Sequence, residues 1–325
     1  MSLDIHSGFE YIYIFKTYKG TDRMNALAEL DPTNFAEMAA LAGMTEPTPT
    51  TGGYSTLKRL GLQHKALTAK QEIKGKKVNV EVVEAGSYRI EGPTRDDPKV
   101  YATEVTFRPF MQRFLYKRFV KGVGGMPNEY IKTVMGTDIK ADLKDNSGTF
   151  NCGKPSGYVE DWNSVPEQTQ KIIKATKRTR VIFGLATFRN AINDQGETVN
   201  TEEEVPVVWE VDNRDAFKTM GVPFNQMMKR SVMPMQYTMD LKSEAVDLPN
   251  GDQFYLPLQS LDLSDAKDLD ADDQETFKNF LDWIKQRNKW VTEDWEAKNV
   301  ATLDDDQKAL VNEFVDVTLD EEIPF

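Results

Sequence analysis

Short runs of alternating apolar residues recur through the middle of the chain and set the strongest limit on its fold. Val78, Val80 and Val82 alternate with polar residues in the first of these runs. Residues 101–107 alternate again, and further strand-like runs, several of them rich in β-branched or aromatic residues, lie at residues 88–90, 110–120, 178–188, 205–211, 235–247 and 254–258. Alternation of this kind is typical of half-buried β-strands. The last two runs flank Asn250-Gly251, a dipeptide that favours a tight hairpin turn. The pattern predicts a mainly β protein.

Helical periodicity is confined to a few segments. Phe277, Phe280 and Ile284 lie at helical spacing, and they predict a helix from about Asp272 to Lys289, with an extension to about residue 298 as an alternative. Shorter helices are predicted at residues 165–176, 213–220 and 305–315. Near the N-terminus, residues 10–16 predict a strand and residues 31–43 a helix. Many short strands with few helices between them favour a barrel or sandwich with added helices, and a general α+β fold is the alternative.

Composition suggests how the chain is divided. Residues 45–53 (TEPTPTTGG) contain little that a core could bury, so they predict a flexible linker. We therefore expect an N-terminal strand and helix segment at residues 1–44 and a β-rich body at residues 54–261. An acidic helical segment at residues 262–312 and an acidic tail at residues 313–325 follow.

The net charge of −12 arises entirely from the C-terminal part of the chain. Residues 262–325 contain 19 acidic and 7 basic residues, whereas the preceding 261 residues contain 33 of each sign. The body is therefore neutral overall and is free to carry a basic face.

Two acid-free basic blocks in the body are the candidates for such a face. Residues 107–121 (FRPFMQRFLYKRFVK) interleave cations with aromatic rings, and residues 171–180 (KIIKATKRTR) hold five cations. Single-stranded nucleic acid is bound by cations that contact phosphates and by rings on which bases stack. The predicted phosphate contacts are Arg108, Arg113, Lys117, Arg118, Lys177, Arg178 and Arg180, and the predicted stacking rings are Phe110, Phe114 and Tyr116. The alternative interpretation is a core strand with a solvated basic rim.

Near-matches to catalytic and metal-binding motifs fail at the residues that matter. Residues 148–155 (GTFNCGKP) approach a phosphate-binding loop, but Pro155 replaces the hydroxyl residue that would bind the metal. That loop remains a candidate border for a nucleic-acid groove. Residues 268–273 alternate acids as a calcium loop does, yet Asp273 stands where such a loop needs glycine. Cys152 is expected to be structural, and the two histidines have no ligand or triad spacing. The sequence predicts a protein that is not an enzyme and has no metal or cofactor.

The expected compartment is the cytoplasm. One cysteine excludes an intramolecular disulfide framework, and the N-terminal residues show no secretory signal. No window approaches the ~20 apolar residues that a membrane span requires.

The last six residues combine three acids with an apolar end. Asp320, Glu321 and Glu322 precede Ile323, Pro324 and Phe325. An apolar pair at the end of an acidic segment suits a pocket on another protein that is rimmed by cations. This tip resembles the acidic C-terminus of bacterial single-stranded DNA-binding proteins, which ends in acids followed by Ile-Pro-Phe. The length and the charge separation make the chain look more like a phage replication protein with this role.

The resemblance implies an OB-fold-like barrel, with insertions, that binds single-stranded DNA without sequence preference in replication, recombination or repair. It implies that the tip recruits a polymerase, a helicase or primase, or a nuclease, and that a phage-encoded protein would act in the host cytoplasm. It further implies that the tail competes with DNA for the binding groove. A virion or scaffold protein with an acidic assembly tail is the alternative, and self-association is left open.

Overall fold

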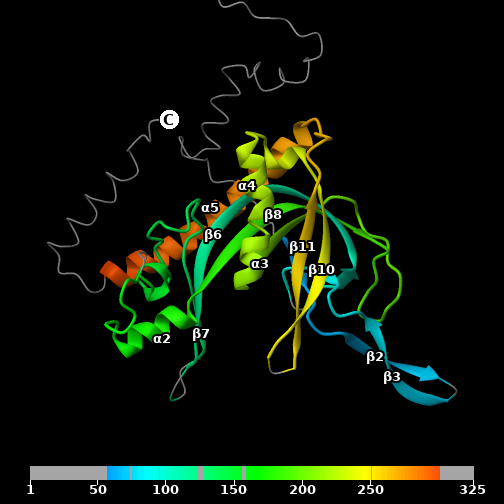
Figure 1. The fold of residues 1–325 in the computed structure, drawn as a ribbon, viewed down its shortest axis with the longest axis horizontal. Coiled ribbons are helices and arrows are strands. Elements are labelled where there is room, and N and C mark those ends of the chain that lie inside the picture. The colour runs from blue at the N-terminus through cyan, green and yellow to red at the C-terminus, as the bar shows by residue number, and fades with distance from the viewer. Residues whose placement is uncertain are drawn as a thin grey trace, which may run out of the picture. The chain divides into compact units, whose positions relative to one another are not determined.

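Two long antiparallel strands, β6 (Glu104–Val120) and β8 (Lys177–Arg189), form the centre of the computed structural model (Figure 1). The structure describes residues 57–73, 75–94, 96–122, 124, 127–155, 159–249 and 251–300. The predictions for the N-terminal 1–44 segment, the linker, the helix at 305–315 and the C-terminal tip lie outside these residues.

The central pair belongs to a curved sheet of nine strands within the described residues. Its order is β11-β10-β6-β8-β9-β1-β4-β5, and β7 pairs with the far end of β6. The remaining strands of this sheet are β1 (Lys58–Leu62), β4 (Tyr88–Glu91), β5 (Lys99–Ala102), β7 (Glu129–Lys132), β9 (Val205–Val211), β10 (Met239–Asp247) and β11 (Gln253–Leu261). All the pairs are antiparallel except that of β1 with β9.

The sheet is not closed into a barrel. Its two ends, β11 and β5, do not pair with each other in the described part of the chain. Isolated hydrogen bonds instead connect the β10–β11 hairpin to the β4 end of the sheet: Tyr88 Oη donates to the Lys242 carbonyl (2.8 Å), and Ser243 Oγ donates to the Gly86 carbonyl (2.7 Å). The prediction of a mainly β fold with added helices is confirmed, and the open sheet is equally consistent with the α+β alternative.

A β-bulge in β6 reverses which residues face which side of the sheet. Pro109 pairs with Gly184 and Met111 with Phe183, so Phe110 is the extra residue. The sheet has a hydrophobic core on each face. Before the bulge, Phe107 packs into the first core, whereas Phe110 in the bulge and Met111 after it pack into the second. A bulge of this kind shifts the two-residue alternation by one position.

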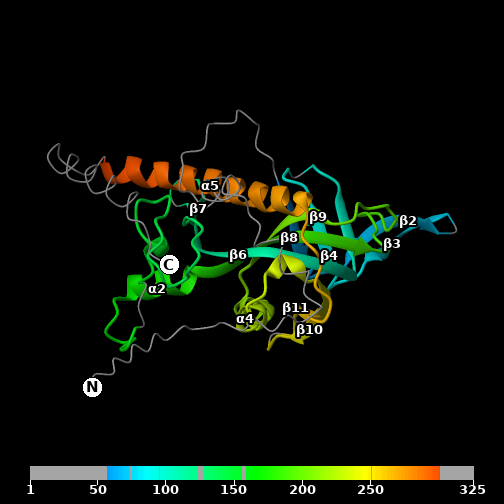
Figure 2. The same ribbon diagram turned by 90° about the horizontal axis from the view of Figure 1, so that it is seen from above.

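Helices cover both faces of the sheet. The first core lies against α3 (Arg214–Thr219) and α4 (Val222–Lys229), which are followed by the short η2 (Pro234–Gln236). The second core lies under α5 (Ala271–Val300), whose Phe280 and Ile284 are buried against β6 and β8. Figure 2 shows α5 on the opposite side of these strands from α4 and the β10–β11 hairpin. We call the two faces the α3 side and the α5 side.

The connection between β6 and β8 is an insertion with its own small core. It contains β7, η1 (Asn151–Gly153) and α2 (Glu167–Ala175), and it packs around Tyr116, Ile131, Leu143 and Cys152. The helix α5 holds this insertion from the other side. Asn288 Oδ1 accepts from the Met135 N–H (2.7 Å), and its amide donates to the Met135 carbonyl (3.0 Å).

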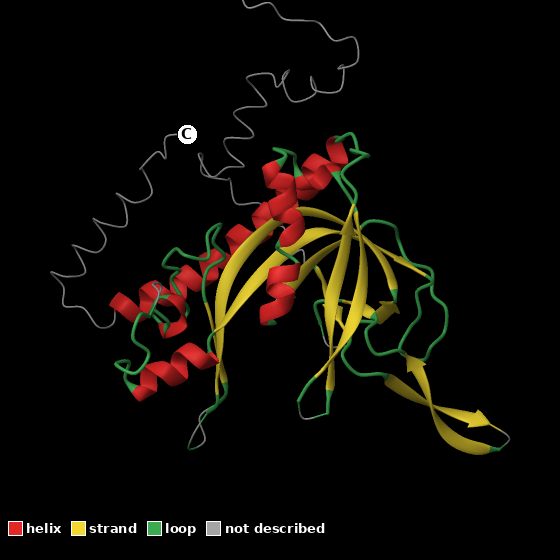
Figure 3. Cartoon of the chain, viewed as in Figure 1, coloured by secondary structure: helices red, strands yellow, loops and turns green. Residues whose placement is uncertain are grey.

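A separate hairpin is formed by β2 (Leu67–Ile73) and β3 (Lys76–Val83). Figure 3 shows it projecting from the larger sheet. Most of its described side chains are exposed, including Val78 at 44%.

Local sequence signals located most of these elements. The helix predicted at residues 213–220 is confirmed as α3. Asn213 caps it, because its side chain accepts from the Asp215 and Ala216 N–H groups. The long C-terminal helix and the hairpin between β10 and β11 are also confirmed. The strands β1, β2 and β7 were not predicted, because they are short or lack alternating apolar residues.

Candidate nucleic-acid interface

The register of the central strands divides the predicted contact residues between the two faces. Ile182 lies opposite Gln112 and belongs to the core on the α3 side, whereas Val181 lies opposite Arg113 and belongs to the core on the α5 side. Side chains alternate along a strand. The α3 side therefore carries Phe114, Tyr116, Arg118, Arg178 and Arg180, and the α5 side carries Arg113, Lys117 and Lys177.

Arg108 is buried, so its predicted role at a phosphate is wrong. Its side chain is 2% exposed, with Nη2 2.6 Å from Asp273 Oδ1 and Nε 3.0 Å from Glu204 Oε1. Nη1 also donates to the Met235 carbonyl (3.3 Å). With two carboxylates and a carbonyl around it, Arg108 joins the start of α5 to the sheet.

Phe110 and Tyr116 are core residues, so their predicted roles in base stacking are also wrong. Phe110 packs edge-on against Phe280 of α5, with ring centroids 5.6 Å apart. The Tyr116 ring is 2% exposed in the core of the insertion, and its hydroxyl donates to the Ile139 carbonyl (2.7 Å). The bulge turns Phe110 toward α5, and the insertion covers Tyr116; neither was visible in the alternation of β6.

The cations on the α5 side have partners of their own. Lys117 Nζ lies 3.0 Å from Glu210 and 3.1 Å from Asp212, and Lys177 Nζ lies 3.2 Å from Asp212. Burial lowers the pKa of Lys117, but the two carboxylates outweigh it and leave this pKa raised. The half-buried Arg113 donates to the Gln112 carbonyl (2.9 Å), and burial lowers its pKa.

On the α3 side, three cations converge without a carboxylate partner. Arg118 comes from β6, Lys154 from the loop after η1, and Arg178 from β8, and none of them forms an ion pair within the described residues. Lys154 Nζ lies 5.9 Å from the centre of the Tyr116 ring, and Arg178 stands opposite Tyr116 across the strands. Burial, and then repulsion by Arg178, lower the pKa of Lys154. We call these three residues the cation cluster.

Arg118 supports this assignment because part of its guanidinium group is unsatisfied. Its Nε is buried and has no hydrogen-bond partner in the described structure. The group reaches Gly153, the residue before Lys154, so β6 and the loop meet at the cluster. A buried polar atom without a partner is costly, and an incoming phosphate oxygen would satisfy it.

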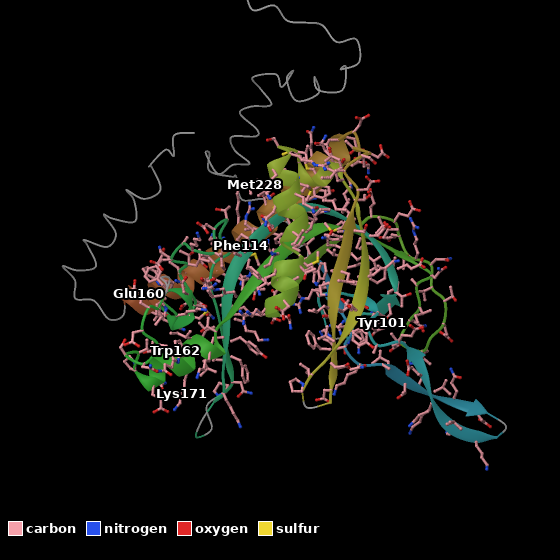
Figure 4. The ribbon with its side chains drawn as sticks, viewed as in Figure 1. Tyr101, Phe114, Glu160, Trp162, Lys171 and Met228 are labelled. Atoms are coloured by element: carbon pink, nitrogen blue, oxygen red, sulfur yellow. The ribbon has the colours of Figure 1, made fainter. Side chains whose placement is uncertain are left out.

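Next to the cluster, Phe114 is held by Arg180. The guanidinium carbon of Arg180 lies 5.1 Å from the centre of the Phe114 ring and 4.5 Å from that of Phe217, and Nε donates to the Phe217 carbonyl (3.1 Å). Burial lowers the pKa of Arg180 to about 10, which still leaves it charged at neutral pH. At 8% exposure Arg180 positions Phe114 and α3 and is not a free phosphate ligand, contrary to its predicted role. Phe114 is half-buried, and Figure 4 shows it above the insertion, which the labels of Trp162 and Lys171 mark.

The loop that presents Lys154 is ordered by one buried carboxylate. Asp145 accepts hydrogen bonds from the backbone N–H groups of Ser147 (2.9 Å), Thr149 (3.1 Å) and Cys152 (2.8 Å). Cys152 is fully buried, and burial raises its pKa to about 12, in agreement with the predicted structural role. Lys298 and Asn299 of α5 donate to the Asn146 and Gly148 carbonyls. The Gly-Lys pair of this loop was the sequence signal for Lys154.

Several exposed rings were not predicted as contacts. Phe119 and Tyr130 pair across β6 and β7 with ring centroids 4.8 Å apart, and they are 46% and 61% exposed. They share the α5 side with Lys117 and Lys132. In the insertion, Lys174 lies 5.5 Å above the Trp162 ring. Tyr130 lies in a four-residue strand, which is too short for periodicity to identify.

Comparisons with known proteins assign no function to this site. No protein-family model matches the chain, and no match was found among the curated proteins or the solved structures. Among the described residues, no group of three or more His, Cys, Asp or Glu side chains is arranged to hold a metal ion. No helix in that part of the chain is both long and apolar enough to cross a membrane.

Proposed function

We propose that this protein binds single-stranded DNA without sequence preference, through the cation cluster and Phe114 on the α3 side. The observation that carries the proposal is the set of three cations that converge beside a half-buried ring with no carboxylate partner among the described residues. Elsewhere on the same two strands, Arg108, Lys117 and Lys177 are already paired with acids.

In this proposal Arg118, Lys154 and Arg178 contact successive phosphates, and a base stacks on Phe114. Neither contact reads a base edge, so binding depends on the backbone and on stacking alone. The curved sheet would then act as an opened OB-type barrel whose longest strands, β6 and β8, carry the DNA on one face.

The test is a fluorescence-polarisation titration of the full-length protein with a labelled oligo(dT) at two salt concentrations. We expect tight binding that weakens as the salt concentration rises. For each phosphate contact, the logarithm of the affinity should fall by about 0.7 for each tenfold increase in salt. A duplex of the same length is the control, because its bases are not free to stack. Equal affinity for the duplex and the single strand would contradict the proposal and favour the assembly-protein alternative.

We also propose that the C-terminal tip, Asp320 to Phe325, recruits replication or repair proteins. Deletion of Ile323 to Phe325 is expected to abolish capture of such partners while leaving oligo(dT) affinity unchanged or higher, because the three deleted residues include no cation that could contact a phosphate. The measurement is the same titration, together with pull-down of a candidate polymerase or helicase. Replacement of the three residues with three serines controls for length. A clear loss of DNA affinity in the deletion would count against the separation of roles.

A further inference from the structure

A cavity of about 520 Å³ opens where β1 and β9 separate. The two strands pair from Lys58 opposite Val207 to Leu60 opposite Trp209, and the pairing then ends. Residues from β4, β7, β11, α3 and α5 complete the lining. None of Arg118, Lys154 and Arg178 is among them, so the cavity is distinct from the cation cluster. Its volume falls within the ~300–1,000 Å³ that is usual for small-molecule sites.

Besides Arg89, three cations from three different elements line this cavity. Arg59 comes from β1, Lys132 from β7 and Arg287 from α5. None of the three forms an ion pair with a carboxylate in the part of the chain that the structure describes. Arg287 Nη1 donates to the Thr133 carbonyl (3.0 Å), whereas its Nη2 is buried and has no hydrogen-bond partner among the residues that the structure describes.

The acids of the cavity are already engaged. Glu91 lies 3.2 Å from Arg89, and Glu210 and Asp212 lie within 3.1 Å of Lys117. Burial first, and then repulsion from Arg287, Lys117 and Arg59, lower the pKa of Lys132 despite the opposing effect of Glu210. Mutual repulsion of this kind is relieved when an anion binds between the cations.

We propose that this cavity binds a phosphorylated ligand of about nucleotide size, with its phosphate held by Arg59, Lys132 and Arg287. Guanidinium groups bind phosphate oxygens in pairs, and the lysine adds a point charge. The apolar side chains of Leu57 and Trp283 also line the cavity and provide a surface for a sugar or base. The proposal does not depend on the DNA-binding function. The phosphate has two potential sources, a free nucleotide or the backbone of a bound strand.

The test measures binding of dTMP and inorganic phosphate to the full-length protein by calorimetry, with thymidine as the ligand that lacks phosphate. We expect dTMP and phosphate to bind and thymidine not to bind. Lys132→Gln should weaken dTMP binding by roughly tenfold or more, since it removes one charge-assisted contact. Lys58→Gln is the matched control, because Lys58 is exposed on β1 beside Arg59 but does not line the cavity.

Two results would overturn the proposal: no binding of either phosphate compound at matched ionic strength, or equal dTMP affinity in the Lys132→Gln and unsubstituted proteins. A titration with oligo(dT) then identifies the source. If Lys132→Gln weakens oligo(dT) as well as dTMP, the cavity takes a phosphate of the strand. If it weakens dTMP alone, the ligand is a free nucleotide. Loss of oligo(dT) binding in cation-cluster variants with normal dTMP binding would separate this site from the proposed DNA interface.

Discussion

Replacing Asp273 with alanine is expected to lower the free energy of unfolding by about 3–5 kcal/mol, because it leaves the charge of Arg108 buried with only part of its compensation. Both side chains are nearly inaccessible, at 2% and 3% exposure, and their closest atoms are 2.6 Å apart. Glu204 is the remaining acid beside Arg108, and it is 40% exposed. Urea denaturation followed by circular dichroism measures the change.

The neighbouring residue provides the control. Asp272 lies in the same first turn of α5 but is exposed, so Asp272→Ala should change the free energy of unfolding by less than about 0.5 kcal/mol. Asp273→Asn keeps the shape and removes only the charge, which separates the ion pair from the hydrogen bonds that Asp273 shares with Asp270. Equal stability of the Asp272→Ala and Asp273→Ala proteins would contradict the structural role of Arg108.

The ion pair between Asp273 and Arg108 also makes the free energy of unfolding depend on pH. Burial raises the pKa of Asp273, but its hydrogen bond and charge interaction with Arg108 outweigh this and hold the pKa below its ordinary value. The contribution of Asp273 is therefore present above the unfolded pKa of about 4 and is lost as the pH falls through the folded pKa. The difference in stability between the unsubstituted and Asp273→Asn proteins should narrow in acid.

The second large effect is expected on DNA affinity. Changing the three residues of the cation cluster, Arg118, Lys154 and Arg178, to glutamine removes three proposed phosphate contacts. The plot of log affinity against log salt should become shallower, with the magnitude of its slope reduced by roughly 2, at about 0.7 for each contact. Oligo(dT) titrations at four or more salt concentrations measure this slope directly.

The β2–β3 hairpin offers a matched control with the same change in charge. Lys70, Lys76 and Lys77 are exposed there, and changing all three to glutamine should leave the slope close to that of the unsubstituted protein. An equal fall in both triple variants would show that affinity follows overall charge and would contradict the assigned face. Phe114→Leu tests stacking separately: it keeps an apolar side chain and should cost about 1–3 kcal/mol of binding free energy.

Local patterns were sufficient to predict elements. Alternating, β-branched and aromatic residues identified β6, β8 and β9, and helical spacing identified α5. Each of these signals depends on residues within one turn or one strand, so a single sequence contains it in full. The separation of charge between the body and the C-terminal part is likewise a property of the sequence alone.

Which side chains of those elements meet a partner was decided only by the tertiary structure. The bulge at Phe110 reverses the alternation of β6, so no regular pattern could place Arg108 and Phe114 correctly. Arg108 pairs with Asp273, which lies 165 residues further along the chain, and Lys117 pairs with Glu210, which lies 93 residues further along. The sequence determined that residues 107–121 form a basic, aromatic strand. Only long-range packing decided that Arg118 and Arg178 form no ion pair with a carboxylate in the described part of the chain, because a cation's partners depend on which distant acid the fold brings to it.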